Sequence, residues 1–181
     1  TPWLTFPQPL AFAELVGGGH ALVAVSGTQL SVFDAETMHR RVGPIDLGAS
    51  PLRLTVNAQS NVIAMTFPTD ASAGFAERIE SYDVRTGKPQ AASVVVAGPL
   101  RQFVLSADGT RLLATGPAQE PTPVFDALTL HRIGSYRPGA GSSVVWASFE
   151  PHGDALGGRS GECTPRPLAT RRVSGDHNTH E

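Results

Sequence analysis

Three aspartates are the residues whose type and spacing first suggest chemistry. Asp34, Asp83 and Asp126 each directly follow a Phe or Tyr, and they lie 49 and 43 residues apart. Carboxylates gathered in one place can act as a general acid and base or bind a metal ion. A carboxylate that recurs after strand ends can instead accept hydrogen bonds from amides two or three residues ahead and fix a tight turn. The regular repetition favours the turn-fixing role.

The six histidines are the next candidates for a metal site or a general base. His39 and His131 each stand five residues after one of these aspartates, so a repeated structural position accounts for both without a ligand. His177 and His180 are three residues apart and would share one face of a helix, as metal ligands can. They lie in a C-terminal stretch without periodicity, which favours a solvated end. We therefore predict no metal site.

Other patterns associated with catalysis are incomplete. The single cysteine, Cys163, excludes an intramolecular disulfide and a multi-cysteine zinc site, and no base is placed to activate its thiol. Residues 158–161 have the wrong spacing for a nucleophile elbow. The glycine-rich residues 139–143 join two expected strands and precede no helix that could hold a phosphate. The sequence predicts no catalytic residue and no cofactor.

Aromatic residues outside the regular pattern are candidates for contact with a partner. Tryptophan is enriched at interface hot spots, and Trp3 lies among prolines before the first expected strand. Trp146 stands inside an apolar strand, where core packing is the expectation. Residues 68–77 form the longest insertion between strands, and this loop contains Phe75. We name Phe75 and Trp3 as possible contacts with a protein partner. The commoner alternative is that the loop has no binding role.

Composition and charge narrow the class of partner. The 181 residues carry a net charge of −2, so no overall positive field attracts nucleic acid or anionic lipid. No apolar run approaches the roughly 18 residues of a membrane helix. Apolar residues at 40% and charged residues at 17% are ordinary for a soluble globular protein. We expect neither a nucleic-acid nor a membrane partner, and a cytoplasmic location or, if a leader has been removed, a periplasmic one.

These residues fall within a repeat in which an apolar strand, a polar turn and a second apolar strand recur four times. The equivalent apolar positions are Leu22, Ile63, Leu112 and Leu156, at steps of 41, 49 and 44 residues. In the third copy the turn contains Asp108-Gly109, a strong hairpin signal because Gly accepts a positive φ and Asp bonds nearby amides. Residues 52–56 alternate between apolar and polar, as in a strand. Because Pro or Gly interrupts almost every possible helix, the predicted fold class is all-β.

A unit of about 40–45 residues with four short strands is typical of a β-propeller blade. Over residues 10–158 the chain resembles the WD-repeat and YVTN-type propeller families, through the Phe/Tyr-Asp turn and the Ser-x-Asp-Gly-x-x-Leu-x-Ala hairpin at residues 106–114. No Trp-Asp dipeptide closes a strand, and Gly19-His20 lies inside a hairpin turn rather than at the start of a blade. The resemblance is therefore to the looser bacterial repeats, and it implies blades of four antiparallel strands.

The repeat divides the chain into an N-terminal lead-in (residues 1–9), a partial propeller (10–158) and a disordered tail (159–181). The expected blade pieces, about three blades in all, are residues 10–34, 35–83, 84–126 and 127–158. Propellers close with roughly 4–8 blades, so an open arc leaves two blade faces uncovered. We expect a fragment of a larger propeller, or a ring that another chain completes.

The resemblance implies a non-catalytic protein-interaction or scaffold module. Its expected partners are a protein or peptide, or the further blades of the ring. The alternative is a fragment of a propeller enzyme, either a hydrolase or a quinone-dependent dehydrogenase, whose active site lies on other blades. The fold does not decide between the two, whereas bound metal or turnover would favour the enzyme.

Overall fold

The computed structural model describes residues 4–57, 61–69, 76–116, 121–136, 144–149, 155–160 and 171–172. Every regular element in these ranges is a β-strand, and every strand pair is antiparallel, which confirms the all-β prediction. The described residues contain no helix long and apolar enough to cross a membrane.

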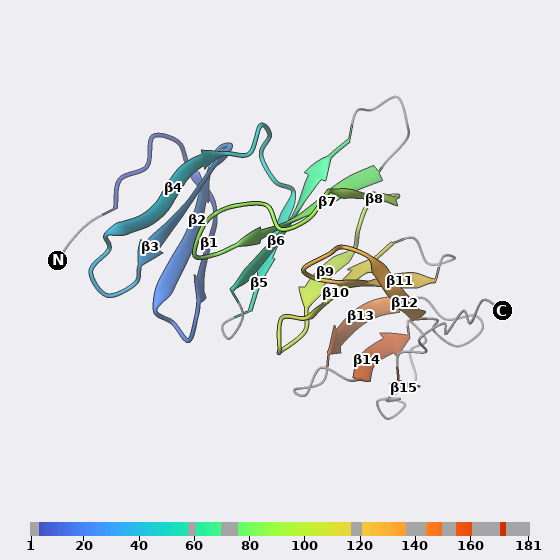
Figure 1. Cartoon of the computed structure of the whole chain (residues 1–181). Coiled ribbons are helices and arrows are strands. Elements are labelled where there is room, and N and C mark those ends of the chain that lie inside the picture. The colour runs from blue at the N-terminus through green and yellow to red at the C-terminus, as the bar shows by residue number, and fades with distance from the viewer. Residues whose placement is uncertain are drawn as a thin grey trace.

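The strands form four sheets, which we call blades 1 to 4, and Figure 1 shows them side by side in chain order. Blade 1 contains β1 (Leu10–Val16), β2 (Ala21–Ser26), β3 (Gln29–Asp34) and β4 (Arg40–Asp46). Blade 2 contains β5 (Arg53–Val56), β6 (Val62–Pro68), β7 (Ala76–Asp83) and β8 (Val94–Ala97). Blade 3 contains β9 (Gln102–Leu105), β10 (Arg111–Thr115), β11 (Thr122–Asp126) and β12 (Arg132–Tyr136). Blade 4 contains β13 (Val144–Phe149), β14 (Ala155–Ser160) and the short β15 (Arg171–Arg172).

The sheets divide the chain one strand later than the sequence repeat suggested. Blades 1, 2 and 3 span residues 10–46, 53–97 and 102–136, whereas the expected pieces ended at Asp34, Asp83 and Asp126. The reason is that each aspartate begins a tight turn, which folds the following strand back against the same sheet as its fourth member. Within the expected tail (159–181), β15 is described and pairs with β14.

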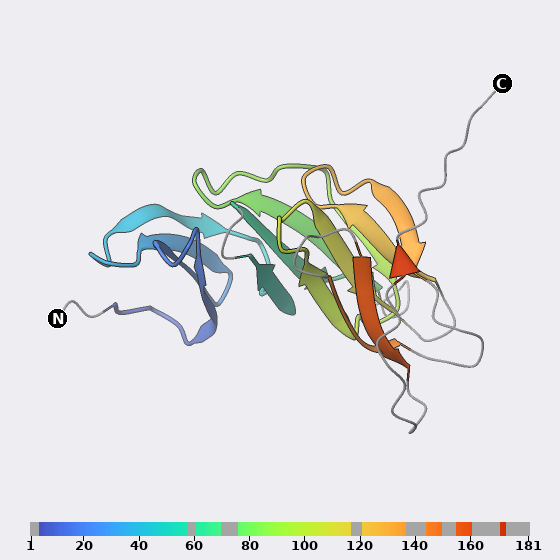
Figure 2. The same cartoon turned by 90° about the horizontal axis from the view of Figure 1, so that it is seen from below.

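The core lies between neighbouring blades. Strand β6 is buried on both faces, because Ile63, Met65 and Phe67 pack toward blade 1 whereas Val62 and Ala64 pack toward blade 3. A strand covered on both sides reads as a continuous apolar run, and this explains why alternation is weak there. Figure 2, seen from below, shows the same stacking of one sheet against the next. Two clusters of buried apolar side chains fill these interfaces, one between blades 1 and 2 and one between blades 2 and 3.

The first cluster joins blades 1 and 2. Its buried members are Val16, Ala21, Val23, Val25, Leu30, Val32, Leu47, Ile63, Met65, Phe67, Tyr82 and Val84. The second cluster joins blades 2 and 3, and its buried members are Val62, Ala64, Ile79, Val96, Leu100, Phe103, Leu105, Leu112, Ala114, Phe125, Ala127 and Leu130. Each blade thus depends on its neighbours for burial, as expected of stacked repeats.

Candidate functional site

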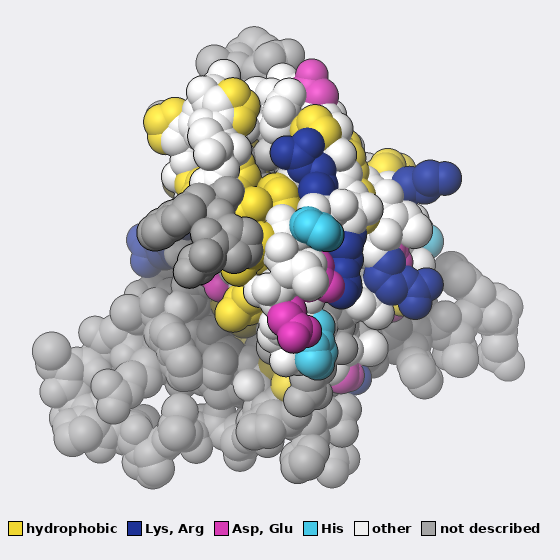
Figure 3. All heavy atoms as spheres, turned by 90° about the vertical axis from the view of Figure 1, so that its left-hand side faces the viewer, with side chains coloured by type: hydrophobic (Ala, Val, Ile, Leu, Met, Phe, Trp, Pro, Cys, Tyr) yellow, Lys and Arg dark blue, Asp and Glu magenta, His cyan; other side chains and the backbone are white. Residues whose placement is uncertain are grey.

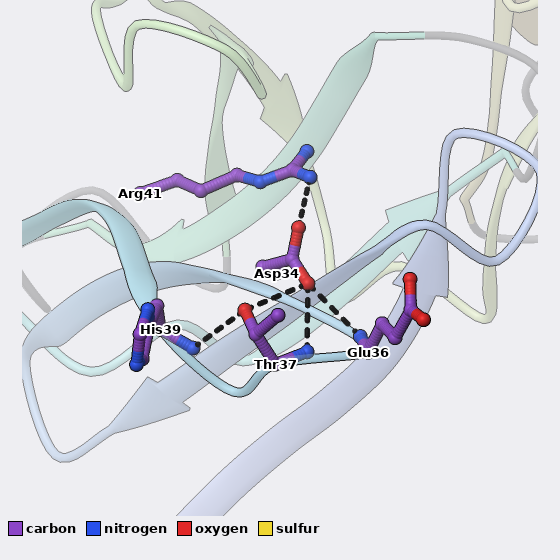
Figure 4. A network of polar contacts seen from close by, with 5 residues as sticks. All are labelled: Asp34, Glu36, Thr37, His39 and Arg41. Carbon is purple, nitrogen blue, oxygen red and sulfur yellow. Dashed lines mark hydrogen bonds and ion pairs between the residues drawn. The ribbon is translucent and has the colours of Figure 1, made fainter.

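The turn after β3 is organised by one carboxylate. Oδ1 of Asp34 accepts hydrogen bonds from the amides of Glu36 (3.1 Å) and Thr37 (2.8 Å) and from the Thr37 hydroxyl (2.9 Å), as Figure 4 shows. The Thr37 hydroxyl in turn accepts a bond from the amide of His39 (3.4 Å), and Oδ2 of Asp34 pairs with the Arg41 guanidinium. These interactions hold the pKa of Asp34 well below its usual range, and the largest cause is the Thr37 amide. Both oxygens of the carboxylate are therefore bonded, Oδ1 to the turn and Oδ2 to Arg41 on β4.

The same arrangement recurs after β7. Oδ1 of Asp83 accepts from the amides of Arg85 (2.8 Å) and Thr86 (2.9 Å) and from the Thr86 hydroxyl (3.2 Å). The amide of Lys88 donates to the Thr86 hydroxyl (3.3 Å), so Lys88 takes the place that His39 has in blade 1. The equivalence of a histidine and a lysine at this position favours a role for the backbone rather than for the side chain.

The third copy follows β11. Oδ1 of Asp126 accepts from the amides of Leu128 (3.0 Å) and Thr129 (2.8 Å) and from the Thr129 hydroxyl (2.9 Å), and the amide of His131 donates to that hydroxyl (3.4 Å). The structure therefore places the three aspartates at equivalent corners of three blades, each bound to its own turn. Among the described residues no group of three or more His, Cys, Asp or Glu side chains could hold a metal ion.

Sequence reasoning named the aspartates but missed two features of these turns. The threonine three residues later, such as Thr37, serves as both donor and acceptor, and its recurrence in all three copies was the available signal. The residue after each threonine has a left-handed backbone, at Met38 (φ 57°), Gly87 (φ 67°) and Leu130 (φ 54°). Gly adopts this conformation without strain, whereas Met and Leu do not.

The hairpin of blade 3 uses Asp108 and Gly109. Oδ1 of Asp108 accepts from the Ser106 hydroxyl (2.5 Å) and the Thr110 amide (3.0 Å), and Gly109 has a φ of 71°. Partial burial raises the pKa of Asp108, but these bonds outweigh burial and leave the pKa lowered overall. The side chain thus closes the turn between β9 and β10.

The two candidate contact residues, Trp3 and Phe75, lie outside the described residues. The base of the loop that contains Phe75 is closed by Thr69, whose amide (3.4 Å) and hydroxyl (3.0 Å) both donate to the carbonyl of Ala76. The cysteine, both C-terminal histidines and the glycine-rich residues 139–143 also lie outside the described ranges.

A polar ladder joins blade 2 to blade 3 along their first strands. Arg53 donates to the carbonyl of Leu100, the amide of Leu105 donates to Oγ1 of Thr55 (3.4 Å), and the Asn57 amide group donates to the carbonyl of Ser106. Alternate residues of a strand face the same side, so residues 53, 55 and 57 all project toward blade 3. These hydrogen bonds fix the position of blade 3 along the strand direction of blade 2.

A buried carboxylate stands at one end of this ladder. Glu77 is 4% exposed, and its Oε1 accepts a hydrogen bond from the amide of Leu100 (2.8 Å). Its Oε2 lies 3.5 Å from Nε of Arg53, which forms an ion pair. A buried carboxylate needs such partners, because desolvation without them costs several kcal/mol. Arg53 and Glu77 together bind both polar backbone groups of Leu100.

The outer face of blade 1 carries partly uncovered apolar residues. Leu10 and Leu15 are 46% and 54% exposed, whereas Leu105, the counterpart of Leu15 in blade 3, is buried against blade 2. The N-terminal lead-in covers part of this face, where the Phe6 ring packs edge-on against Phe33 at 5.9 Å. Figure 3 looks onto this side and shows hydrophobic side chains along its centre, with Lys and Arg side chains beside them.

Comparison with known proteins finds neither a matching family model nor a matching curated protein. Solved structures do match. The complex of KlAtg21 with the coiled-coil of AgAtg16 has a TM-score of 0.71 and 15% identity, over 94% of this chain and 54% of that one. Kluyveromyces lactis Hsv2p has a TM-score of 0.64 and 17% identity, over 96% of this chain and 52% of that one.

At such low identity the likeness establishes the fold. These solved proteins are WD-repeat β-propellers, and the four-stranded antiparallel sheets agree with their blades. The chain spans about half the length of the structures it matches. This chain therefore has the fold of an arc of β-propeller blades.

Proposed function

We propose that the chain is a non-catalytic protein-interaction module within a β-propeller scaffold. The observation that carries the proposal is the likeness to KlAtg21, a propeller whose solved structure is a complex with a coiled coil. The described acidic turn residues support it, because each of their carboxylates is bonded within its own turn rather than directed at a shared centre. A rigid set of blades that presents variable loops suits the binding of a protein or peptide.

The loop between β6 and β7 is the contact surface we propose, with Phe75 as its apolar anchor and Trp3 as a second candidate. An aromatic side chain can contribute large contact area at low entropic cost. The Thr69–Ala76 bonds hold the two ends of this loop together at the ends of β6 and β7.

The binding test uses the full chain and displayed libraries of coiled-coil and extended peptides. We expect selection of one peptide class, and about a tenfold or larger loss of affinity in Phe75→Ala. The control is Leu128→Ser, which changes an exposed leucine in the turn after β11. Equal binding by wild type and Phe75→Ala would remove the loop from the proposal. Stoichiometric metal together with hydrolase turnover would favour the enzyme alternative.

We also propose that further blades pack on the outer face of blade 1. The positions of Leu22 and Phe33 on this face correspond to Ile63 and Tyr82 of blade 2, which are buried against blade 1. Sedimentation and calorimetry test this directly: self-association, weakened by Leu15→Asp, is expected. A monomer that unfolds cooperatively at all concentrations, with a Leu15→Asp variant of equal stability, would contradict it.

A further inference from the structure

The outer face of blade 1 is the side of that sheet that points away from blade 2. Phe33 lies on this face and is 3% exposed, although no blade precedes blade 1 in the described part of the chain. Its counterparts Tyr82 and Phe125 are buried to a similar depth, but a neighbouring blade covers each of them. In blade 1 the lead-in, of which residues 4–9 are described, covers Phe33 instead.

The lead-in is held on this face by three kinds of contact. The Phe6 ring packs edge-on against Phe33, with 5.9 Å between the ring centroids. The carbonyl of Gln8 accepts a hydrogen bond from the hydroxyl of Ser26 (2.7 Å), which is itself a buried residue. The Gln8 side chain lies against Gly27, where an added Cβ would come within 2.8 Å of Cδ of Gln8. An aromatic contact, a hydrogen bond and close packing thus hold the lead-in in one place.

Small residues of blade 1 leave room for the lead-in. Ala24 and Ser26 stand on the outer face at the positions where blade 2 has Met65 and Phe67, counted from the equivalent apolar residues of the repeat. Met65 and Phe67 project toward blade 1 and fill that interface. Alanine and serine fill much less volume, yet both residues are buried in blade 1. The shape of this part of the face therefore favours a slender segment of chain over it.

The cover is incomplete near β1. Leu15 is 54% exposed, whereas its counterpart Leu105 is buried against blade 2. A blade that packs on the exposed part of this face, as blade 2 packs on blade 3, would also need the surface of Phe33, since the counterpart Phe125 belongs to the cluster between blades 2 and 3. Phe6 already occupies that surface. The lead-in and a further blade therefore exclude each other.

We propose that the lead-in is a displaceable cover of the outer face of blade 1, and that a further blade packs there only after residues 4–9 leave. This inference rests on the proposal that further blades pack on this face. Because the cover lowers the fraction of molecules whose face is open, it weakens the apparent association by the same factor. Pro7 and Pro9 flank Gln8 and have no amide hydrogen to donate, so this stretch is not fixed to blade 1 as a fifth strand.

The first experiment measures self-association of the full chain by sedimentation velocity. Phe6→Ser loosens the cover, and we expect the dissociation constant for self-association to fall about 3–10-fold relative to wild type. The matched control is Phe6→Leu, which keeps an apolar side chain against Phe33 and should stay closer to wild type. Addition of Leu15→Asp to Phe6→Ser should weaken self-association again, because the freed face then carries a charge.

The second experiment measures the cover itself, at a concentration at which the protein is monomeric. Cys163 is the only cysteine, so a Cys163→Ser chain that also carries Ser26→Cys has one thiol, placed under the lead-in. Its reaction with a thiol reagent should be slow, and Phe6→Ser should accelerate it about 3–10-fold, in step with the change in self-association. Phe6→Leu should leave the reaction slow.

The outcomes separate this inference from the proposal on which it rests. If Leu15→Asp weakens self-association but Phe6→Ser does not strengthen it, the outer face still binds a blade and only the cover is overturned. Equal thiol reaction rates with Phe6→Ser and Phe6→Leu would also overturn the cover alone. If Leu15→Asp changes self-association in neither background, the packing of further blades on this face fails, and the cover fails with it.

Discussion

The contact between blades 1 and 2 differs in chemistry from the contact between blades 2 and 3. The first is a cluster of aliphatic and aromatic side chains around Met65 and Phe67. The second has an apolar cluster of similar size, but it adds the ladder from β5 and the buried ion pair between Arg53 and Glu77. Apolar packing rewards volume and is tolerant of direction, whereas hydrogen bonds demand one register. The second contact therefore specifies the placement of its blade more strictly.

The two contacts also differ at one equivalent position in the turns that follow the aspartates. Gly87 of blade 2 lies so close to blade 1 that an added Cβ would come within 2.6 Å of Val42 Cγ1 and 2.1 Å of Ile45 Cδ1. In blade 3 the equivalent residue is Leu130, which is buried in the cluster with blade 2. The turn of blade 2 approaches blade 1 closely because Gly87 has no side chain, whereas the turn of blade 3 contacts blade 2 through the side chain of Leu130. The backbone conformation is thus the same in both turns, and the residue type differs with the blade surface that it faces.

The largest expected effect comes from removing volume between blades 1 and 2. Phe67 is fully buried, so Phe67→Ala should destabilise the protein by about 3–5 kcal/mol in urea unfolding. Leu112→Ala, in the cluster between blades 2 and 3, is the comparison and should cost about 2–5 kcal/mol. A cost below about 1 kcal/mol for Phe67→Ala would mean that the first contact is not closely packed.

Removal of the carboxylate between blades 2 and 3 should have the next largest effect. Glu77→Ala leaves Arg53 and the Leu100 amide without their partner, and we expect a loss of about 2–3 kcal/mol, less than for a fully buried pair because Arg53 is partly exposed. Chemical denaturation of the single variants and of Arg53→Ala/Glu77→Ala forms a double-mutant cycle. Additive losses would show that the pair does not couple, and the contrast between the two contacts would disappear.

The turn position gives a smaller effect. Gly87→Ala must adopt a left-handed backbone and displace Ile45, so we expect a loss of about 1–2 kcal/mol. The control is Met38, which has the same backbone conformation in blade 1: Met38→Gly should be more stable than Met38→Ala by about 1 kcal/mol. Thermal unfolding of the three variants measures both. If Ala and Gly were equivalent at Met38, backbone strain could not explain the result at Gly87.

Lowering the pH should destabilise the Asp34 turn of blade 1 without weakening the apolar contact between blades 1 and 2. The pKa of Asp34 is lowered in the folded protein, so its contribution is complete above the unfolded value of about 4 and is lost as pH falls below that. Unfolding midpoints between about pH 5 and pH 2 should therefore fall less steeply for Asp34→Asn than for wild type. Parallel curves for the two proteins would assign the acid sensitivity to other carboxyls, such as Asp46 and Asp108.

Sequence alone predicted the parts of this fold that local chemistry dictates. The strands, the Asp108-Gly109 hairpin and the three aspartate positions follow from nearby residues, and the structure places each aspartate on the same set of bonds. The grouping of strands into blades was shifted, because a repeat has no natural first strand and only pairing decides it. The Arg53–Glu77 pair was invisible, since its partners come from different strands and meet at Leu100, 47 residues from Arg53.

Burial of β6 on both faces has a consequence for the unfolded chain. Residues 62–67 are all buried between two neighbours, carry no charge and contain no proline. Short segments of high β-propensity and low charge are those that stack into intermolecular cross-β assemblies when exposed. Pro68 ends the segment directly, and it acts as a gatekeeper because it cannot donate a backbone hydrogen bond to an incoming strand. Loss of either neighbouring blade would therefore expose one face of β6 and make this strand an aggregation-prone segment.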